Sequence, residues 1–234
     1  MKKFIVLVLL GIVIYLITSF IAFADLEYAR KPAVQEKVEG KDIKGLYDFY
    51  VASTPESEGR PSYGDETASI TIMVFQDPGS DASHFFMRER FPELMQEFIM
   101  PGKARFIPKY YLTLQDFEEK TDTFLYANTL ACVNILKPDV YFDVYMESFT
   151  VSLEKLTTLI TAKGITEEQL MECMTRPPQD LIQDLSEVEG FGIVGIAPRI
   201  YVGIHGQGNT ILNGVPSYQR IWRSIRDQQI LLGD

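Results

Sequence analysis

Residues that could do chemistry gather in one short segment after the first strongly β-branched run of the chain. The segment Asp77–His84 (Asp-Pro-Gly-Ser-Asp-Ala-Ser-His) contains two hydroxyls, two carboxylates and an imidazole. Ser80 and His84 stand four residues apart, so a helix would place them on one face, as a nucleophile and its base require. No orienting acid or oxyanion element accompanies them, so a hydrolase built on Ser80 is a marginal alternative. We expect Ser80 to cap a helix, with Ser83 as a hydroxyl in its first turn.

The other polar motifs predict neither a metal nor a cofactor. Asp77, Asp81 and His84 lack any recognised ligand spacing. Gly190–Gly195 matches Gly-x-Gly-x-x-Gly literally, but it follows an acidic helical segment and precedes a strand, the reverse of the dinucleotide-binding context. His205 falls in a glycine-rich loop, where we expect a solvated side chain.

Cys132 and Cys173 are the only cysteines of the chain and stand 41 residues apart. Both lie inside segments with helical spacing. A catalytic cysteine is expected at the start of a helix, with a resolving partner about two or three residues away. The two residues could form a structural bridge in an oxidising compartment, or remain two buried thiols that act as small apolar side chains.

The elements that must position these residues are read from apolar periodicity. Ser69–Phe75 and Ala104–Tyr111 are apolar runs typical of buried strands. Between them, Asp81–Ile99 has helical spacing that Pro92 interrupts. Further helices are expected at five places: Phe117–Ile135, Val140–Phe149, Leu153–Lys163, Glu167–Met174 and Asp180–Val188. Gly164 and Thr166 have the residue types that end one helix and cap the next.

The C-terminal part returns to strands before a last helix. Arg199–Val202 and Thr210–Leu212 predict a hairpin, and Ser217–Leu232 predicts a helix. The element order is therefore strand, helix, strand, a block of helices, hairpin and helix.

This order resembles the DsbA-like branch of the thioredoxin superfamily, and local motifs support the resemblance. Gly64–Ala68 is similar to the family's Gly-Asp-x-x-Ala lead-in to a buried strand. Phe75–Asp77 and Ser80–Ser83 fall where the family has Phe-x-Asp and Cys-Pro-Tyr-Cys. Ile196-Ala197-Pro198 falls at the cis-proline loop, and Asn213–Pro216 resembles the turn before the last helix. The resemblance covers about Pro61 to Ile230.

Departures from the family pattern matter for the chemistry. Ser80 and Ser83 occupy both cysteine positions, and Val74 stands where relatives often have an acid. A cysteine at a helix N-terminus is held as a nucleophilic thiolate, whereas a serine hydroxyl there remains protonated and cannot form a disulfide. Thiol–disulfide exchange at Ser80-Asp81-Ala82-Ser83 is therefore chemically excluded. We expect a degenerate site with no catalytic residue.

The resemblance implies a fold and a binding face. It implies an α/β thioredoxin-like domain over residues 64–234, with the helical block inserted at about 113–190. It favours a bridge between Cys132 and Cys173, because many relatives have a cysteine in each corresponding helix. It also implies a cis Ala197–Pro198 bond. The expected binding residues are Gly79, Ser80, Ser83, Ala197, Pro198 and Arg199; the charge of Arg199 could select an acidic partner or point to solvent.

The N-terminus predicts export. Phe4–Ala24 follows two lysines and carries no charge. Its length of about 20 residues favours a membrane-spanning anchor, while Ala22-Phe23-Ala24 has the form of a signal-peptide cleavage site. Either interpretation places the rest of the chain outside the cytoplasm, in the periplasm or at the cell surface. Residues 25–63 are expected to form a linker, with a short helix over Ile43–Tyr50.

The composition of the chain argues against one class of partner. A net charge of −10 argues against a nucleic-acid partner, which needs clustered lysine and arginine. We expect a membrane-tethered, non-enzymatic domain that binds an extracytoplasmic polypeptide or serves as a subunit of a membrane complex. The alternative is a thiol–disulfide oxidoreductase or isomerase that uses Cys132 and Cys173.

Overall fold

The computed structural model describes residues 49–51, 54–191, 193, 195, 197–204 and 209–233. The expected anchor Phe4–Ala24, most of the expected linker, Ile196 and the loop around His205 lie outside these residues. Within the described part of the chain, no helix is both long enough and apolar enough to cross a membrane.

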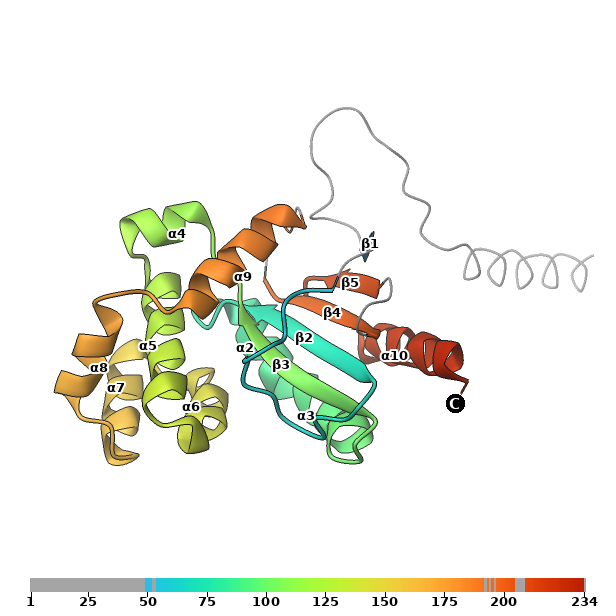
Figure 1. Cartoon of the computed structure of the whole chain (residues 1–234), viewed down its shortest axis with the longest axis horizontal. Helices are drawn as coiled ribbons and strands as arrows, with labels where there is room; N and C mark the ends of the chain where they lie inside the picture. Colours follow the sequence, from blue (N-terminus) through green and yellow to red (C-terminus); the bar gives the residue numbers. More distant parts are fainter. Residues whose placement is uncertain are drawn as a thin grey trace, which may run out of the picture. The chain divides into compact units, whose positions relative to one another are not determined.

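A mixed sheet forms the centre of the described domain (Figure 1). Its strands follow the order β1 (Phe49–Val51), β5 (Asn209–Asn213), β4 (Arg199–Ile204), β2 (Ile70–Gln76) and β3 (Ala104–Tyr110). β2 and β3 pair in parallel, and the other neighbours pair antiparallel. The two central strands are buried along their whole length, as their apolar sequences predict.

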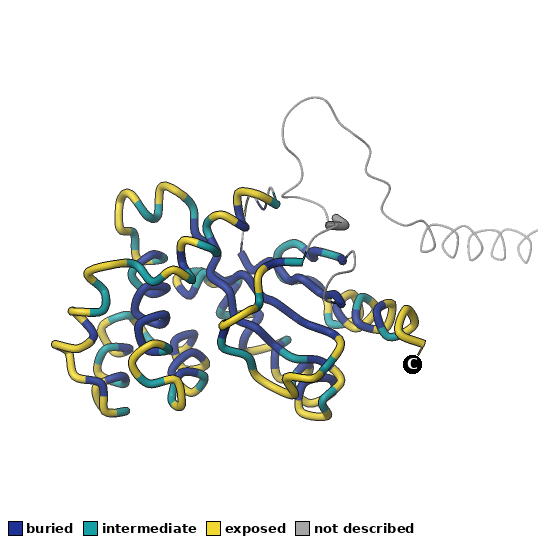
Figure 2. The backbone as a smooth tube through the Cα atoms, viewed as in Figure 1, coloured by how far each residue is buried: buried dark blue, intermediate teal, exposed yellow. Residues whose placement is uncertain are grey.

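Alternate residues of β2 enter two hydrophobic cores, one on each face of the sheet. Ile70, Ile72 and Val74 belong to the larger core, together with residues of α2 (Asp81–Glu89), α10 (Tyr218–Leu232) and the helical block between β3 and β4. Met73 and Phe75 belong to the smaller core, which includes residues of α9 (Gln179–Gly190) and the loop that follows it. Dark blue in Figure 2 follows the strands and the inner faces of the helices, so the sheet is covered on both sides.

The first helical region is divided at the position of its proline. α2 (Asp81–Glu89) ends before Pro92, which lies in the first turn of α3 (Phe91–Leu94), and a π-helical turn η1 (Met95–Ile99) continues from it. Proline is tolerated there because the first amides of a helix have no intrahelical partner.

The helical block follows β3 and lies to one side of the sheet (Figure 1). Its elements are α4 (Leu114–Glu119), α5 (Asp122–Leu136), η2 (Pro138–Val140), α6 (Tyr141–Ser148), α7 (Leu153–Ala162), α8 (Glu167–Met174) and α9 (Gln179–Gly190). α10 (Tyr218–Leu232) ends the domain. The single helix expected over Phe117–Ile135 is wrong, because Lys120 is left-handed (φ 53°) and Thr121 caps a new helix. The Thr166 cap and the positive φ of Gly164 (92°) are confirmed.

A disulfide joins Cys132 in α5 to Cys173 in α8, with 5.9 Å between the two Cα atoms. The expected bridge is thus confirmed. Cys132 is buried in the larger core, and Cys173 is half-buried beside it.

The end of the expected linker belongs to the folded domain. Phe49 and Tyr50 form part of strand β1 on β5, not the end of a short helix. Tyr63 exchanges two backbone hydrogen bonds of 2.8 Å with Phe106 of β3. Arg60, between them, is buried. These contacts join residues far apart in sequence, which is why local composition suggested a linker.

Candidate functional site

The turn after β2 holds Ser80 at the start of α2. The Ser80 amide donates to the Asp77 carbonyl (3.0 Å), and the Ser80 hydroxyl accepts a hydrogen bond from the Ser83 amide (3.2 Å). Ser80 is therefore the N-cap of α2, as expected.

Both serine hydroxyls are engaged within the turn. Ser80 Oγ donates to Ser83 Oγ across 3.0 Å, and Ser83 Oγ accepts from the Asp77 amide across 3.2 Å. Ser83 is completely buried, whereas Gly79 is exposed and Ser80 is half-buried. The Ser80 hydroxyl thus acts as a structural cap that donates to a second hydroxyl.

His84 does not activate Ser80 in this arrangement. Its Nε2 lies 2.6 Å from the carbonyl oxygen of Pro78, so Nε2 carries a proton and donates. Its ring meets Phe149 edge-on, with 5.9 Å between centroids. A base would have to face the hydroxyl that it deprotonates, and this imidazole is committed to a backbone carbonyl. The geometry gives no support to the hydrolase alternative.

Asp77 braces the turn against the helical block. Its Oδ1 accepts hydrogen bonds from the Gly79 amide (2.7 Å) and from the Thr123 hydroxyl of α5 (3.0 Å). Burial raises the pKa of Asp77, and the two hydrogen bonds oppose that shift. Among the described residues, no group of three or more histidine, cysteine or acidic side chains could hold a metal ion.

The Ala197–Pro198 bond is cis, as expected, and lies at the same end of the sheet. β4 pairs antiparallel with β2 so that Arg199 faces Phe75, which puts Pro198 beside the point where β2 enters the Asp77–Ser80 turn. Tyr111 links the two: its amide donates to the Gln76 carbonyl and its hydroxyl to the Gly195 carbonyl, both at 2.8 Å. Burial raises the pKa of the Tyr111 hydroxyl, so it remains a donor.

Most residues of the expected binding face are inaccessible. Ala197, Pro198 and Ser83 are buried, and Arg199 is only 2% exposed. Arg199 therefore does not point to solvent, while its selection of an acidic partner stays a prediction. β4 lies between two other strands and is covered on both faces, so all its side chains are buried. The reachable part of this end is Gly79 to Ala82.

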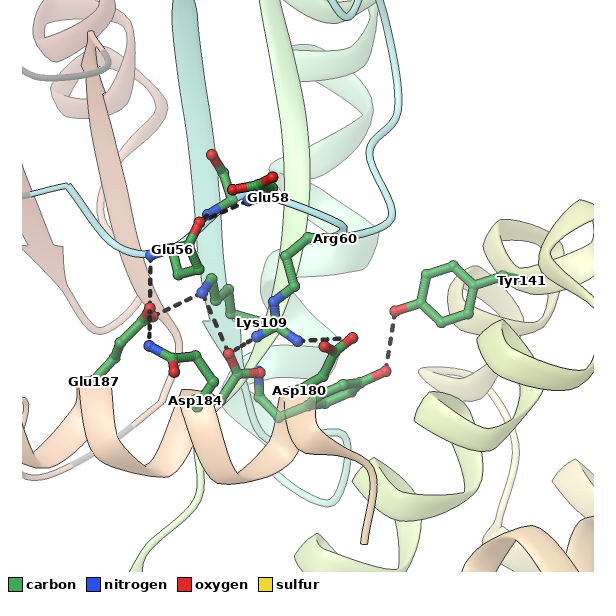
Figure 3. Close-up of polar contacts among 11 residues, drawn as sticks. Glu56, Glu58, Arg60, Lys109, Tyr141, Asp180, Asp184 and Glu187 are labelled. Carbon is green, nitrogen blue, oxygen red and sulfur yellow. Dashed lines mark hydrogen bonds and ion pairs between the residues drawn. The ribbon is translucent and has the colours of Figure 1, made fainter.

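The sequence patterns did not predict a buried charged cluster, which lies between α9 and β3 (Figure 3). Lys109 of β3, which is completely buried, places Nζ 2.7 Å from Glu187 Oε2 and 3.4 Å from Asp184 Oδ1. Arg60 forms ion pairs with Asp180 (3.0 Å) and with Asp184. The three acids are spaced four and three residues apart on α9, a stripe that helical periodicity could have revealed.

Backbone amides complete the charged cluster. The Glu56 amide donates to Glu187 Oε1 (2.6 Å), and the Tyr110 amide donates to Asp184 Oδ2 (2.8 Å). Burial lowers the pKa of Lys109 to about 8, and nearby Arg60 adds to this effect while Glu187 opposes it. The cluster fastens residues 56–60 and β3 to the helix that precedes the cis-proline loop.

Comparisons with known proteins identify the fold. No protein-family model and no curated protein matches the chain. Solved structures match with good coverage, and these neighbours are DsbA-like thioredoxin-fold proteins.

Three of these structures illustrate the similarity. Oxidised BdbD from Bacillus subtilis has a TM-score of 0.63 and 20% identity, with 76% of this chain and 97% of that chain covered. DsbA from Chlamydia trachomatis has a TM-score of 0.59 and 21% identity, with 76% and 94% covered. The thiol–disulfide exchange protein α-DsbA2 from Wolbachia pipientis has a TM-score of 0.57 and 17% identity, with 73% and 87% covered. At these identities the similarity establishes the fold alone.

Proposed function

We propose that this chain is an extracytoplasmic, polypeptide-binding domain with a DsbA-like fold, tethered to a membrane through Phe4–Ala24. It performs no thiol–disulfide exchange at Ser80-Asp81-Ala82-Ser83. The observation that carries the proposal is the capped start of α2 beside exposed Gly79, where both serine hydroxyls are held in structural hydrogen bonds.

The chemistry of the side chains supports the loss of redox function. A hydroxyl at a helix N-terminus keeps its proton and forms no mixed disulfide, so the site has no sulfur with which to begin exchange. The only sulfur pair in the chain is Cys132–Cys173. Cys132 is completely buried in α5, and half-buried Cys173 lies near the C-terminal end of α8, where no helix N-terminus stabilises a thiolate. This burial favours a structural role over the oxidoreductase alternative.

Polypeptide binding would use backbone contacts more than side-chain chemistry. An extended chain can add to an exposed backbone edge, with hydrogen bonds that depend little on sequence. The exposed Gly79 and half-buried Ser80 offer the accessible approach to this end of the sheet. The partner is proposed to be an extended segment of an extracytoplasmic protein, in solution or within a membrane complex.

Site-specific photocrosslinking tests this proposal. A photoreactive amino acid at Gly79 should crosslink to reduced and alkylated lysozyme, a polypeptide that stays unfolded, whereas the same group at exposed Met171 of α8 should not. Pro198→Ala should reduce the crosslinking yield at Gly79 even at temperatures where the variant remains folded. Equal yields at Gly79 and Met171, or a yield unchanged by Pro198→Ala, would contradict binding at this end.

A further inference from the structure

α10 carries an exposed surface that the proposed function does not use. Its inner face, with Ile221 and Ile225, is buried against the sheet. On the outer face Trp222 is 40% exposed, and in the last turn Ile230 and Leu231 are 64% and 65% exposed. Leu232 is also exposed. Single exposed apolar residues are ordinary, but three in succession at a helix end, on the same helix as an exposed tryptophan, form an apolar tip.

The helix that ends in this apolar tip also carries cations. α10 contains three arginines, Arg220, Arg223 and Arg226, and one acid, Asp227, in a chain whose net charge is −10. Trp222, Arg226 and Ile230 follow one another at intervals of four and so form one row along the helix. The Arg226 guanidinium lies over the Trp222 ring, 5.4 Å from its centroid. α10 thus carries three cations against one acid, whereas the whole chain has 22 lysines and arginines against 32 acids.

The apolar tip lies at the opposite end of the sheet from Ser80. Leu232 and Gln229 line a shallow hollow of about 310 Å³ together with Ile70, the first residue of β2, and Lys103. Ser80 follows the other end of β2, which at about 3.3 Å per residue is roughly 20 Å away. Lys103 adds a further exposed cation here. Asp65, close to Gly102 of this hollow, already accepts hydrogen bonds from the Thr67 amide and hydroxyl.

We propose that the outer face and C-terminal tip of α10 dock onto the surface of an anionic lipid bilayer. Aliphatic side chains and a tryptophan beside arginines are the composition of helices that bind the headgroup region, where apolar groups enter the acyl boundary and cations meet phosphates. An acidic polypeptide would satisfy the arginines but would leave Ile230, Leu231 and Leu232 in water. Docking by this end would direct the Ser80 and Pro198 end away from the bilayer, toward polypeptides in the surrounding compartment.

The single tryptophan of the chain reports directly on this surface. The full chain is reconstituted into vesicles of phosphatidylcholine alone or of phosphatidylcholine with phosphatidylglycerol, each with and without brominated acyl chains. We expect Trp222 emission to shift to shorter wavelength and to be quenched by brominated lipid in the anionic vesicles, with much weaker effects in neutral ones. Added salt should reverse the difference, because it screens charges at the surface.

Variants separate docking from a general effect of charge. Arg223→Gln with Arg226→Gln should weaken the docking equilibrium about 25-fold, since each cation near an anionic surface contributes about a factor of five. The matched control, Lys155→Gln with Arg176→Gln in exposed positions of the helical block, should leave quenching unchanged. The difference between anionic and neutral vesicles is compared within each variant, because Arg226 itself touches the indole ring.

Three outcomes would overturn the proposal. Equal quenching in neutral and anionic vesicles would show that attraction between the arginines and anionic lipids does not drive docking. A blue shift produced by polyglutamate without lipid would assign the surface to an acidic polypeptide. A shift that grows with protein concentration without lipid would assign it to a second copy of this chain. None of these readouts depends on binding at Gly79, so failure here is distinguishable from failure of the proposed function.

Discussion

Lys109 Nζ lies 2.7 Å from Glu187 Oε2 and joins β3 to α9 in the interior of the domain. The two residues are 78 positions apart in sequence. Two buried charges lose their hydration, so such a pair persists only with good geometry and further hydrogen bonds. Arg60, Asp184 and the Glu56 amide supply those further contacts. The segment before β2, β3 and α9 are thereby held together.

Removing Arg60 should be strongly destabilising. Arg60→Ala removes one ion pair from the buried carboxylate of Asp184, which then keeps Lys109 and the Tyr110 amide as partners. We expect a loss of about 3 kcal/mol in the free energy of unfolding. The exposed Arg88–Glu89 pair provides the control, because Arg88→Ala should change stability by less than about 0.5 kcal/mol. Urea denaturation measures both values. A loss below about 1 kcal/mol for Arg60→Ala would mean that the cluster contributes little.

Stability should depend on pH through Lys109. Its pKa is lowered to about 8 in the folded chain from an ordinary value of 10.5, so between these pH values the unfolded chain binds more protons. The contribution of Lys109 to the free energy of unfolding is therefore least favourable below pH 8, and it becomes more favourable as the pH rises to 10.5. The stability of the wild type minus that of Lys109→Met should increase by up to about 3 kcal/mol over this window.

The exposed substitution Lys155→Met controls for the loss of one charge, and denaturation at each pH measures the difference. A difference between wild type and Lys109→Met that falls as the pH rises would show that ion pairing outweighs burial at Lys109.

The disulfide should stabilise the domain without serving exchange. Cys132→Ala with Cys173→Ala should lower the free energy of unfolding by about 4 kcal/mol on the chain-entropy model. Crosslinking at Gly79 should persist at temperatures where the variant remains folded. Titration of the denatured, unreduced wild type should find no free thiol. Two reactive thiols, or insulin reduction that disappears in this variant, would refute the structural role.

Restoring sulfur should restore exchange. The Ser80 and Ser83 hydroxyls are 3.0 Å apart at a helix N-terminus, the environment that lowers the pKa of a cysteine thiol. Ser80→Cys with Ser83→Cys should form a second disulfide and reduce insulin measurably above background, while the wild type and the Ser80→Ala, Ser83→Ala control stay at background. Insulin reduction by the wild type equal to that of the cysteine variant would contradict the proposal of a redox-inactive site.

The sequence by itself determined the features that depend on near neighbours. Strand β2 followed from its β-branched run, the Ser80 and Thr166 caps from their residue types, and the absence of a cysteine pair at the start of α2 from Ser80 and Ser83. The resemblance in motif order added the inserted helical block, the Cys132–Cys173 bridge and the cis bond before Pro198. The strand and the caps depend on local propensity, whereas the features added by the resemblance depend on the order of motifs along the chain.

Tertiary structure decided the rest. Arg199 looks like a surface charge at the start of a strand, but β2 and β5 flank that strand and helices cover its faces, so the side chain is buried. Phe49–Val51 forms a strand because β5, about 160 residues later, offers an edge. Arg60 and Lys109 meet the acids of α9 only when distant segments pack together. The free energy of such contacts depends on which groups lose water at the same place, and that is a property of the folded chain.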